Sequence, residues 1–331
     1  MVQDIKKMIE EYALDPKNYD FFAQLLTRIL PTYNEWCWGQ PSIYKRYFPL
    51  WQRAGFNLTP NHYYSPLPSL PELSLSQINH LSSLLGIELR VEFQLQLLEL
   101  FGRRYRNEYR VFNDELPNLE GRFYFGNGAF ERVDAEVLYC MIRHFKPRQL
   151  VEIGAGYSTL VSAAACQVNL DEGAPCHFIA VEPFPNDLFK NHISGLSELR
   201  KCKLESIDLS LFTSLGENDI VFIDSSHVIK CGNDVEYEYL ELIPRLRPGV
   251  VIHIHDIFVP LNYPESWLKE EFVFWNEQYL LQAFLAFNRI FETLWSGCYM
   301  HLNFPNLLTE AFTGYNHRKV LPGSYWIRRC C

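Results

Sequence analysis

The second half of this 331-residue chain alternates short apolar segments with helix-like stretches. Such alternation is typical of a parallel sheet whose two faces are covered by helices, and ligands of such sheets bind beyond the carboxyl ends of the strands. The sequence therefore predicts an α/β domain with its functional site at that edge. The expected parallel strands are residues 150–153, 178–181, 203–207, 220–224 and 250–255.

The first of these strands runs into a glycine turn, Gly154-Ala155-Gly156, before a helix of small residues begins at Ser158. The two glycines permit positive φ and let a ligand approach the backbone closely, and Ser158 is a favourable helix cap. Free N–H groups at a helix start attract an anionic group. The turn therefore predicts a nucleotide-like or carboxylate-bearing cofactor, although a glycine pair also occurs where a helix and a sheet merely pack closely.

Ionisable side chains follow the next strands. Glu182 ends the second strand, where an acidic side chain can accept hydrogen bonds from the ribose hydroxyls of an adenosine group. Asp224 and Ser225 follow the fourth strand, and His255-Asp256 follows the fifth. These residues are expected to meet at the edge of the sheet where a ligand would bind.

Four segments carry a resemblance to a known family. They read VEIGAGYST (151–159), VEPF (181–184), DIVFIDSSH (219–227) and LRPGVVIHIHD (246–256). In this order and spacing they resemble the strand ends of class I methyltransferases that use S-adenosylmethionine, a likeness that covers residues 134–329. More closely, the chain resembles a poorly characterised branch distantly similar to the macrocin O-methyltransferase group, whose members modify secondary metabolites and sugars.

The resemblance implies a Rossmann-like, mostly parallel sheet of seven strands within a donor-binding domain at 131–331. Its last two strands, expected at 291–295 and 324–328, would pair with each other. Residues 1–130 are expected to form a mainly helical substrate or cap domain. The helices expected there are 5–13, 19–30, 71–86 and 92–105.

The same resemblance implies S-adenosylmethionine as the cofactor and assigns residues to it. The glycine turn would lie beneath the methionine moiety, Glu182 would bind the ribose, and Asp208 would lie near the adenine. Acidic residues at strand ends also cap neighbouring helices, so a purely structural role is the alternative for Glu152 and Asp208. The full expected set is Glu152, Gly154, Ala155, Gly156, Ser158, Glu182, Asp208, Asp224 and Ser225.

Methyl transfer from a sulfonium is an in-line displacement, so the protein needs to hold a nucleophile near the methyl carbon and to remove its proton. His227 and His255 are the candidate bases, with Asp256 as the orienting group. The resemblance implies that strands four and five are neighbours, which would bring these residues together with Asp224. A structural hydrogen-bond network and a divalent metal site are the alternatives for this cluster.

The resemblance gives a reason to consider a metal site. Macrocin-type relatives bind magnesium through acidic residues at comparable strand ends, but His255-Asp256 stands here where those relatives carry two aspartates. No metal ligand is therefore assigned from the sequence.

The proline-rich loop at residues 58–68 carries His62, Tyr63 and Tyr64. Three prolines forbid a regular helix, so the segment is either a rigid linker packed by its rings or a loop that reaches over the cofactor and offers Tyr63, Tyr64 or His62 to the substrate. Tyr64 is therefore included among the candidate catalytic residues.

The formal net charge of −9 argues against a broadly basic, nucleic-acid-binding surface. No apolar run is long enough for a membrane span, and the N-terminus has no signal-peptide core, so a cytoplasmic location is expected. The nine cysteines are an odd number without a CxxC pair, which favours free thiols. A homo-oligomer is compatible with the sequence.

The sequence thus predicts an S-adenosylmethionine-dependent methyltransferase. The expected acceptor is a hydroxyl or carboxylate on a small metabolite, sugar or modified peptide, as in natural-product tailoring. A dinucleotide-dependent oxidoreductase is one alternative, although the turn Gly-x-Gly-x-x-Thr lacks the third small residue of such folds. A methyltransferase-like binding protein without turnover is the other.

Overall fold

The computed structural model describes residues 15–30, 43–110, 112 and 121–331. The helix expected at 5–13 lies outside these residues. The chain divides into two compact units, Met1–Leu73 and Ser74–Cys331. The division therefore falls well before residue 130, where the sequence suggested a boundary, and the role of the N-terminal part as a cap stays a prediction.

The described part of the first unit is helical. A short 3-10 turn, η1 (Pro16–Asn18), leads into α2 (Tyr19–Ile29), and α3 (Ile43–Arg53) follows. The helix expected at 19–30 is confirmed. The proline-rich loop at 58–68 has turns and no regular element.

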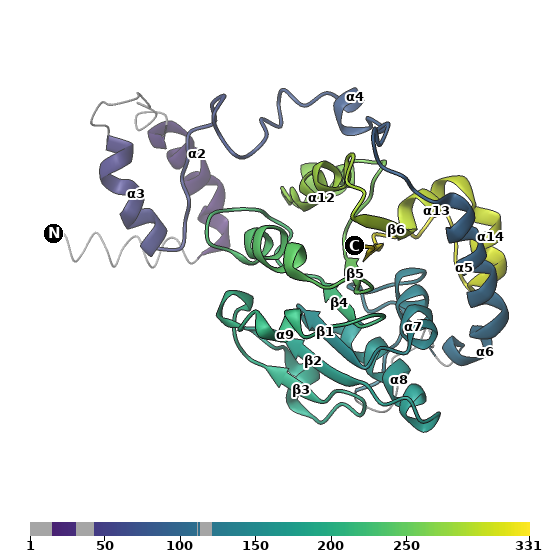
Figure 1. The fold of residues 1–331 in the computed structure, drawn as a ribbon. Helices are drawn as coiled ribbons and strands as arrows, with labels where there is room; N and C mark the ends of the chain where they lie inside the picture. Colours follow the sequence, from purple (N-terminus) through teal and green to yellow (C-terminus); the bar gives the residue numbers. More distant parts are fainter. Residues whose placement is uncertain (1–14, 31–42, 111, 113–120) are drawn as a thin grey trace. The chain divides into compact units, whose positions relative to one another are not determined.

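The second unit is built on one seven-stranded sheet with the order β3-β2-β1-β4-β5-β7-β6 (Figure 1). The strands β1 to β5 pair in parallel, and β7 runs antiparallel to both of its neighbours, β5 and β6. This confirms the Rossmann-like fold and the pairing of the last two strands. The strands are β1 (Gln149–Ile153), β2 (His177–Val181), β3 (Glu198–Arg200), β4 (Ile220–Ile223), β5 (Val251–Ile254), β6 (Phe291–Ser296) and β7 (Tyr325–Arg329).

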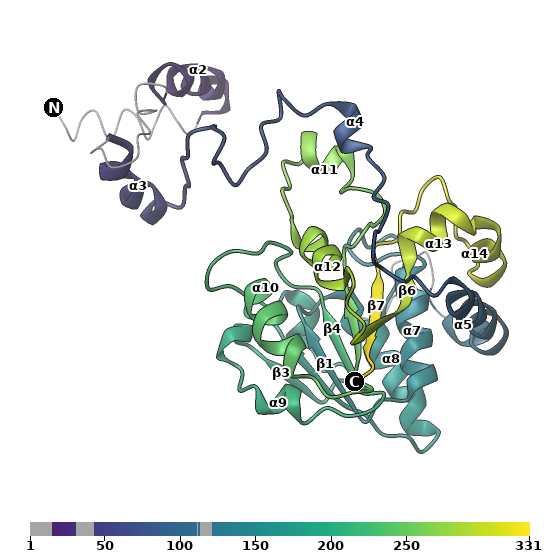
Figure 2. The ribbon, with the colours of Figure 1, turned by 45° about the horizontal axis from the view of Figure 1, so that its top comes forward.

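Helices cover both faces of the sheet (Figure 2). Successive residues of a strand point to opposite faces, so Phe222 of β4 belongs to the core with α7 and α8, whereas Val221 belongs to the core with η5 and α12. The helices are α4 (Leu75–Ile78), α5 (Val91–Arg104), α6 (Arg106–Tyr109), α7 (Asp134–Phe145), α8 (Tyr157–Asp171), α9 (Ser210–Thr213), α10 (Asp234–Tyr237), α11 (Glu265–Lys269), α12 (Glu277–Leu285), α13 (Gly297–Asn303) and α14 (Pro305–Ala311), with 3-10 turns η3 (Asp187–Lys190), η4 (Leu204–Ser206) and η6 (Ile243–Arg245) and a π-helical turn η5 (Glu238–Leu242).

The described residues 74–110 belong to the same compact unit as the sheet, because α5 and α6 contact C-terminal elements. The side-chain Oε1 of Gln94 accepts a hydrogen bond from the backbone N–H of Ser296 at 2.9 Å. The hydroxyl of Tyr109 donates to the carbonyl oxygen of Ala311 at 2.6 Å. These bonds join segments that lie about 200 residues apart, which explains why the compact unit begins near Ser74.

Two expected elements are wrong. The strand expected at 203–207 is instead the 3-10 turn η4, and β3 lies earlier, at Glu198–Arg200. Leu204 and Ile207 are both buried at a spacing of three, which fits a 3-10 turn and not a strand. The helix expected at 71–86 shrinks to α4, which ends at Ile78. Further along the same segment, Leu84 and Gly86 adopt left-handed backbone conformations with φ of 49° and 79°, which a continuous helix would not contain.

Candidate active site

The glycine turn joins the carboxyl ends of β1, β2 and β4. Gly154 has φ +82°, and a Cβ atom at this position would lie 1.8 Å from the carbonyl oxygen of Asp224. The Gly154 N–H donates to the carbonyl of Val181 at 2.9 Å. Only glycine fits here, because the turn passes directly against the residue that follows β4.

Glu182 ties the end of β2 to the same turn. Its Oε2 accepts a hydrogen bond from the N–H of Ala155 at 3.2 Å, and its Oε1 accepts one from the N–H of Phe184 at 2.7 Å. The carboxylate therefore lies beside the glycine turn, as expected for a ribose-binding residue, and its role stays a prediction.

Glu152 of β1 is a fully buried carboxyl group beneath this turn. Its Oε1 accepts a hydrogen bond from the hydroxyl of Ser158 at 2.6 Å, whereas Oε2 has no hydrogen-bond partner among the described residues. Burial raises the pKa of Glu152 to about 8, and the nearby carboxylates of Asp224 and Glu182 add to this. The group is therefore a carboxylic acid near neutral pH.

A cavity of about 460 Å³ opens beside these residues. Gly154, Glu182 and Ser225 line it together with the segment at 203–205. Asp208 is not among the described lining residues, and its carboxylate accepts the N–H of Ser210 at 2.7 Å, as a local cap of α9. A role for Asp208 near an adenine stays a prediction.

Gly156 faces open space, because a Cβ atom there would meet no described atom within 4 Å. The N–H of Gly156 donates to Oγ1 of Thr159 at 3.1 Å, and α8 begins at the next residue, Tyr157. A turn that bends against β4 at one glycine and faces open space at the other is suited to a ligand that lies on the backbone.

The histidine and aspartate residues expected to cluster do lie together, after β4 and β5. His227 Nε2 lies 3.1 Å from Oδ1 of Asp224 and 3.6 Å from Oδ2 of Asp256. His255 Nε2 lies 3.8 Å from Oδ1 of Asp256. The parallel pairing of β4 with β5 produces this arrangement.

Two residues of this cluster hold strained backbone conformations. His227 has φ 57° and Asp256 has φ 55°, in the left-handed region that side-chain-bearing residues rarely adopt. Such conformations cost about 1–3 kcal/mol each and collect at functional sites. The fold therefore stores strain at the residues that bring the imidazole and the two carboxylates together.

The charges within the cluster set its protonation. Burial alone would lower the pKa of His227, but Asp224 and Glu277 raise it well above the ordinary value. Burial likewise opposes protonation of His255, yet Asp256, Asp224 and Asp134 raise its pKa. Both imidazoles therefore keep a proton to higher pH than an ordinary histidine does, and His227 does so more strongly.

His253 differs from the other two histidines. It is fully buried and stacks on Phe222, with ring centroids 4.1 Å apart and an interplanar angle of 8°. Burial, and then the charge of His255, lower its pKa well below the ordinary value. His253 is therefore a neutral core side chain, whose Nε2 lies 3.3 Å from Nδ1 of His255.

Asp224, His227 and Asp256 form a group that is able to hold a cation, since one ligand atom from each lies within 4.8 Å of the others. The set offers one imidazole nitrogen and two carboxylates. Magnesium prefers oxygen ligands alone, whereas manganese, iron and zinc also accept imidazole. These residues therefore fit a nitrogen-accepting divalent cation better than magnesium.

One residue of the cluster, Glu277, was missed by the sequence reasoning. It opens α12 and is fully buried, and its Oε2 lies 3.0 Å from Nδ1 of His227. An acidic residue in a first helical turn looks like an ordinary partner of the helix dipole, so its place in the sequence does not mark it as part of the site. Only the folded chain brings it to His227, fifty positions away.

Tyr64 belongs to the first unit, where its N–H donates to Nδ1 of His62 at 3.0 Å. Its side chain is exposed. Its proposed contact with a substrate stays a prediction.

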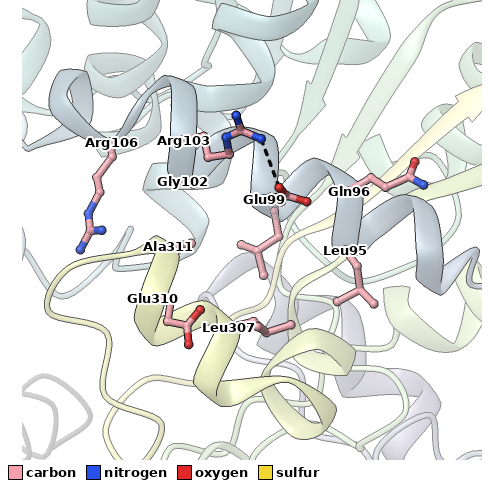
Figure 3. A pocket seen from close by; sticks show the side chains of 10 residues that line it. Leu95, Gln96, Glu99, Gly102, Arg103, Arg106, Leu307, Glu310 and Ala311 are labelled. Carbon is pink, nitrogen blue, oxygen red and sulfur yellow. Dashed lines mark hydrogen bonds and ion pairs between the residues drawn. The ribbon is translucent and has the colours of Figure 1, made fainter.

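A larger hollow of about 780 Å³ lies between α5 and α14 (Figure 3). Leu95 and Leu307 line its apolar part, and Arg103 pairs with Glu99 across 3.3 Å at its edge. Its described lining does not include the glycine turn, whereas Gly154 and Glu182 line the smaller cavity. The smaller cavity at the strand ends is therefore the better candidate for a ligand site, because the buried carboxyl group of Glu152, with its raised pKa, lies beneath the same turn.

Comparison with known proteins agrees with the geometry. A model of a methyltransferase domain family matches residues 151–257, which span the glycine turn, Glu182 and the histidine–aspartate cluster. An uncharacterized protein of Archaeoglobus fulgidus is 31% identical over 176 residues, which are 51% of this chain and 78% of that protein. The sheet and its site define a class I methyltransferase domain. A methyltransferase domain therefore includes residues 151–257, and the chain belongs to one family with this archaeal protein.

Similar solved structures include a methyltransferase of Podospora anserina bound to S-adenosylhomocysteine, at 16% identity and a TM-score of 0.36, covering 72% of this chain and 88% of that one. The O-methyltransferase TomG of Streptomyces achromogenes, involved in tomaymycin synthesis, has 14% identity and a TM-score of 0.35, covering 71% of this chain and 90% of that one.

Among the described residues, no helix combines the length and apolarity needed to cross a bilayer.

Proposed function

We propose that this chain transfers the methyl group of S-adenosylmethionine to an oxygen atom of a small-molecule or peptide acceptor. The observation that carries the proposal is the position of Asp224. Its carbonyl packs against Gly154 in the glycine turn, and its carboxylate lies 3.1 Å from Nε2 of His227 in the cluster. One residue thus joins the donor side of the site to the side where a proton can be moved.

The donor side has residues that fit S-adenosylmethionine. The exposed backbone at Gly156 and the carboxylate of Glu182 are suited to a nucleoside and its hydroxyls, and the buried Oε2 of Glu152 is suited to a hydrogen-bond donor. When bound, S-adenosylmethionine supplies an electrophilic methyl carbon. The chain then needs to orient the acceptor and remove its proton.

Proton removal falls to the cluster after β4 and β5. A neutral imidazole of His255 or His227 would accept the proton of a hydroxyl, with Asp256 beside the ring of each. Because both pKa values are raised, the neutral base becomes more abundant as pH rises above the ordinary histidine range. A carboxylate acceptor, already ionised, would need no base.

A divalent cation would be held by Asp224, His227 and Asp256, and it would lower the pKa of an acceptor hydroxyl as a Lewis acid.

We also propose that the acceptor belongs to natural-product chemistry, that the chain works in the cytoplasm, and that the first unit helps to bind the acceptor. The aromatic side chains of Trp267 and Trp275, with ring centroids 5.1 Å apart near His227, support an aromatic or apolar acceptor group.

A transfer assay tests the proposal. The protein is incubated with S-adenosylmethionine carrying an isotopically labelled methyl group and with separate panels of hydroxyl, carboxylate and amine compounds. We expect labelled product from an oxygen panel, and His255→Gln is expected to slow transfer to hydroxyls while leaving transfer to carboxylates nearly unchanged. Transfer to amines alone would contradict the oxygen acceptor. Hydride exchange with a nicotinamide cofactor would favour the oxidoreductase alternative.

A further inference from the structure

Glu277 holds the ring of His227 from the side that faces away from Asp224. The carboxylate Oε2 lies 3.0 Å from Nδ1 of His227, and Oε1 accepts a hydrogen bond from the hydroxyl of Tyr239 at 3.2 Å. Glu277 and Tyr239 are both buried. A buried carboxylate costs several kcal/mol of desolvation unless donors satisfy it, and these two donors do so.

The same helix start also holds the backbone of His227. The N–H groups of Asn276 and Glu277 donate to the carbonyl of His227 at 3.1 and 3.2 Å. The side chain of Asn276 accepts the N–H of Ile229 at 2.7 Å. Trp275 packs against the imidazole, with ring centroids 4.3 Å apart. The hydrogen bonds from residues 276 and 277 therefore hold the backbone of His227 in its strained φ, and the contact with Trp275 holds the plane of its ring.

We propose that Glu277 is a positioning residue, which keeps a proton on Nδ1 of His227 and thereby directs Nε2 toward Asp224 and Asp256. The inference rests on the proposed function in so far as it assigns the reactive nitrogen of that same site. A histidine that works through one nitrogen depends on the hydrogen bond made by the other, because that bond selects the tautomer and the ring orientation. Glu277 makes that bond here.

The segment between β5 and β6 thus contributes to the site although it lies outside the four family-like sequence segments. The charged groups that face His227 are Asp224 after β4, Asp256 and His255 after β5, and Glu277 of α12. Glu238 of η5 lies close by and accepts the hydroxyl of Ser225 at 3.2 Å. Among these groups, Glu277 is the one that faces Nδ1.

The test reads the tautomer directly by nuclear magnetic resonance of the protein labelled with ¹⁵N in its histidine rings. The spectra are recorded above the raised pKa of His227, where its ring is neutral, and in the wild type we expect this neutral form to carry its proton on Nδ1. Glu277→Leu removes the partner of that proton while Asp224 remains at Nε2, so the preferred tautomer should invert, with a change of about tenfold or more in the ratio. Glu277→Asp should restore part of the wild-type preference.

Glu238→Gln is the matched control, because it replaces another buried carboxyl group close to the site that accepts a hydrogen bond from Ser225 and not from His227, and its tautomer ratio should equal that of the wild type. Should Glu277→Leu fail to fold, Glu277→Gln keeps the volume and should still lower the Nδ1–H fraction. An unchanged ratio in every folded Glu277 variant, or an Nε2–H form in the wild type, overturns the inference. Titration with S-adenosylmethionine separates the two claims: a wild type that binds no donor sinks the proposed function, while the tautomer result stands.

Discussion

A Cβ atom on residue 154 would lie 1.8 Å from the carbonyl oxygen of Asp224, and this contact explains how the turn after β1 passes against the end of β4. Gly154→Ala should therefore force the two strand ends apart and lower the free energy of unfolding by about 3 kcal/mol or more. Urea denaturation measures the change. Loss of less than about 1 kcal/mol would mean that the turn adapts without moving β4.

Gly156→Ala is the matched variant two residues along the same turn. Its φ of −162° is extended backbone that alanine adopts, and its Cβ would point into open space. We expect a change in stability within about 0.5 kcal/mol but weaker binding of S-adenosylmethionine, because the methyl group enters the space assigned to the donor. Unchanged donor affinity would place the ligand elsewhere.

Glu152 should make stability depend on pH. Its pKa of about 8 in the folded chain lies above its unfolded value of 4.5, so its contribution to stability is fully present below pH 4.5 and is lost as pH rises toward 8. Across that window the slope is about 1.4 kcal/mol per pH unit for this one group. Glu152→Gln should therefore gain stability relative to the wild type as pH increases, and should bind the donor more weakly. Parallel pH profiles in urea denaturation would contradict the burial of an uncompensated carboxyl group.

A divalent cation should compete with the proton of His227. Nε2 must lose its proton before it binds a metal, so we expect calorimetry to show tighter binding of Mn²⁺ or Co²⁺ at pH 8 than at pH 6, and tighter binding than that of Mg²⁺. His227→Gln should abolish the preference for these ions over Mg²⁺. If Mg²⁺ bound best, or His227→Gln left binding unchanged, the cluster would not be a nitrogen-containing metal site.

Arg143 should dominate the stability of the packing between α6, α7 and α8. Its side chain is 3% exposed and pairs with Glu108 at 2.7 Å and Glu172 at 2.5 Å. Arg143→Ala removes a buried guanidinium that donates hydrogen bonds to Glu108, Glu172 and Asn169, and because the two carboxylates stay partly exposed the cost should be about 2–3 kcal/mol. Arg103→Ala breaks the exposed pair with Glu99 and should cost less than about 1 kcal/mol. Thermal unfolding compares them, and equal losses would show that burial does not decide the value of these pairs.

Most of the sheet could be predicted from the sequence, because a parallel strand that is buried on both faces reads as a short continuous apolar run. The strands around Val151, Ile179, Val221 and Ile252 are examples. The polar residues Glu182, Asp224 and Asp256, which come after the last three of these strands, could be assigned to one edge once the strands were assumed to be parallel. The clustering of His227 with Asp224 and Asp256 follows from the same reasoning.

Other features depend on contacts that no local pattern records. Leu204 and Ile207 look like a strand until their spacing is matched to a 3-10 turn, and the division near Ser74 depends on distant bonds such as that from Tyr109 to Ala311. Glu277 reaches His227 only because the segment before α12 returns to the end of β4. Its sequence neighbours give no sign of this.

Calorimetric titration with S-adenosylmethionine, and with its demethylated product, tests the central claim most directly. We predict saturable binding of both by the wild type, with about tenfold or greater weakening by Glu182→Ala, since this carboxylate lies at the cavity beside the glycine turn. Asp187→Ala, which removes an exposed carboxylate paired with Lys190, should bind as the wild type does. A folded wild type that binds neither compound, or a Glu182→Ala variant with unchanged affinity, would contradict the assignment of the donor site to this edge of the sheet.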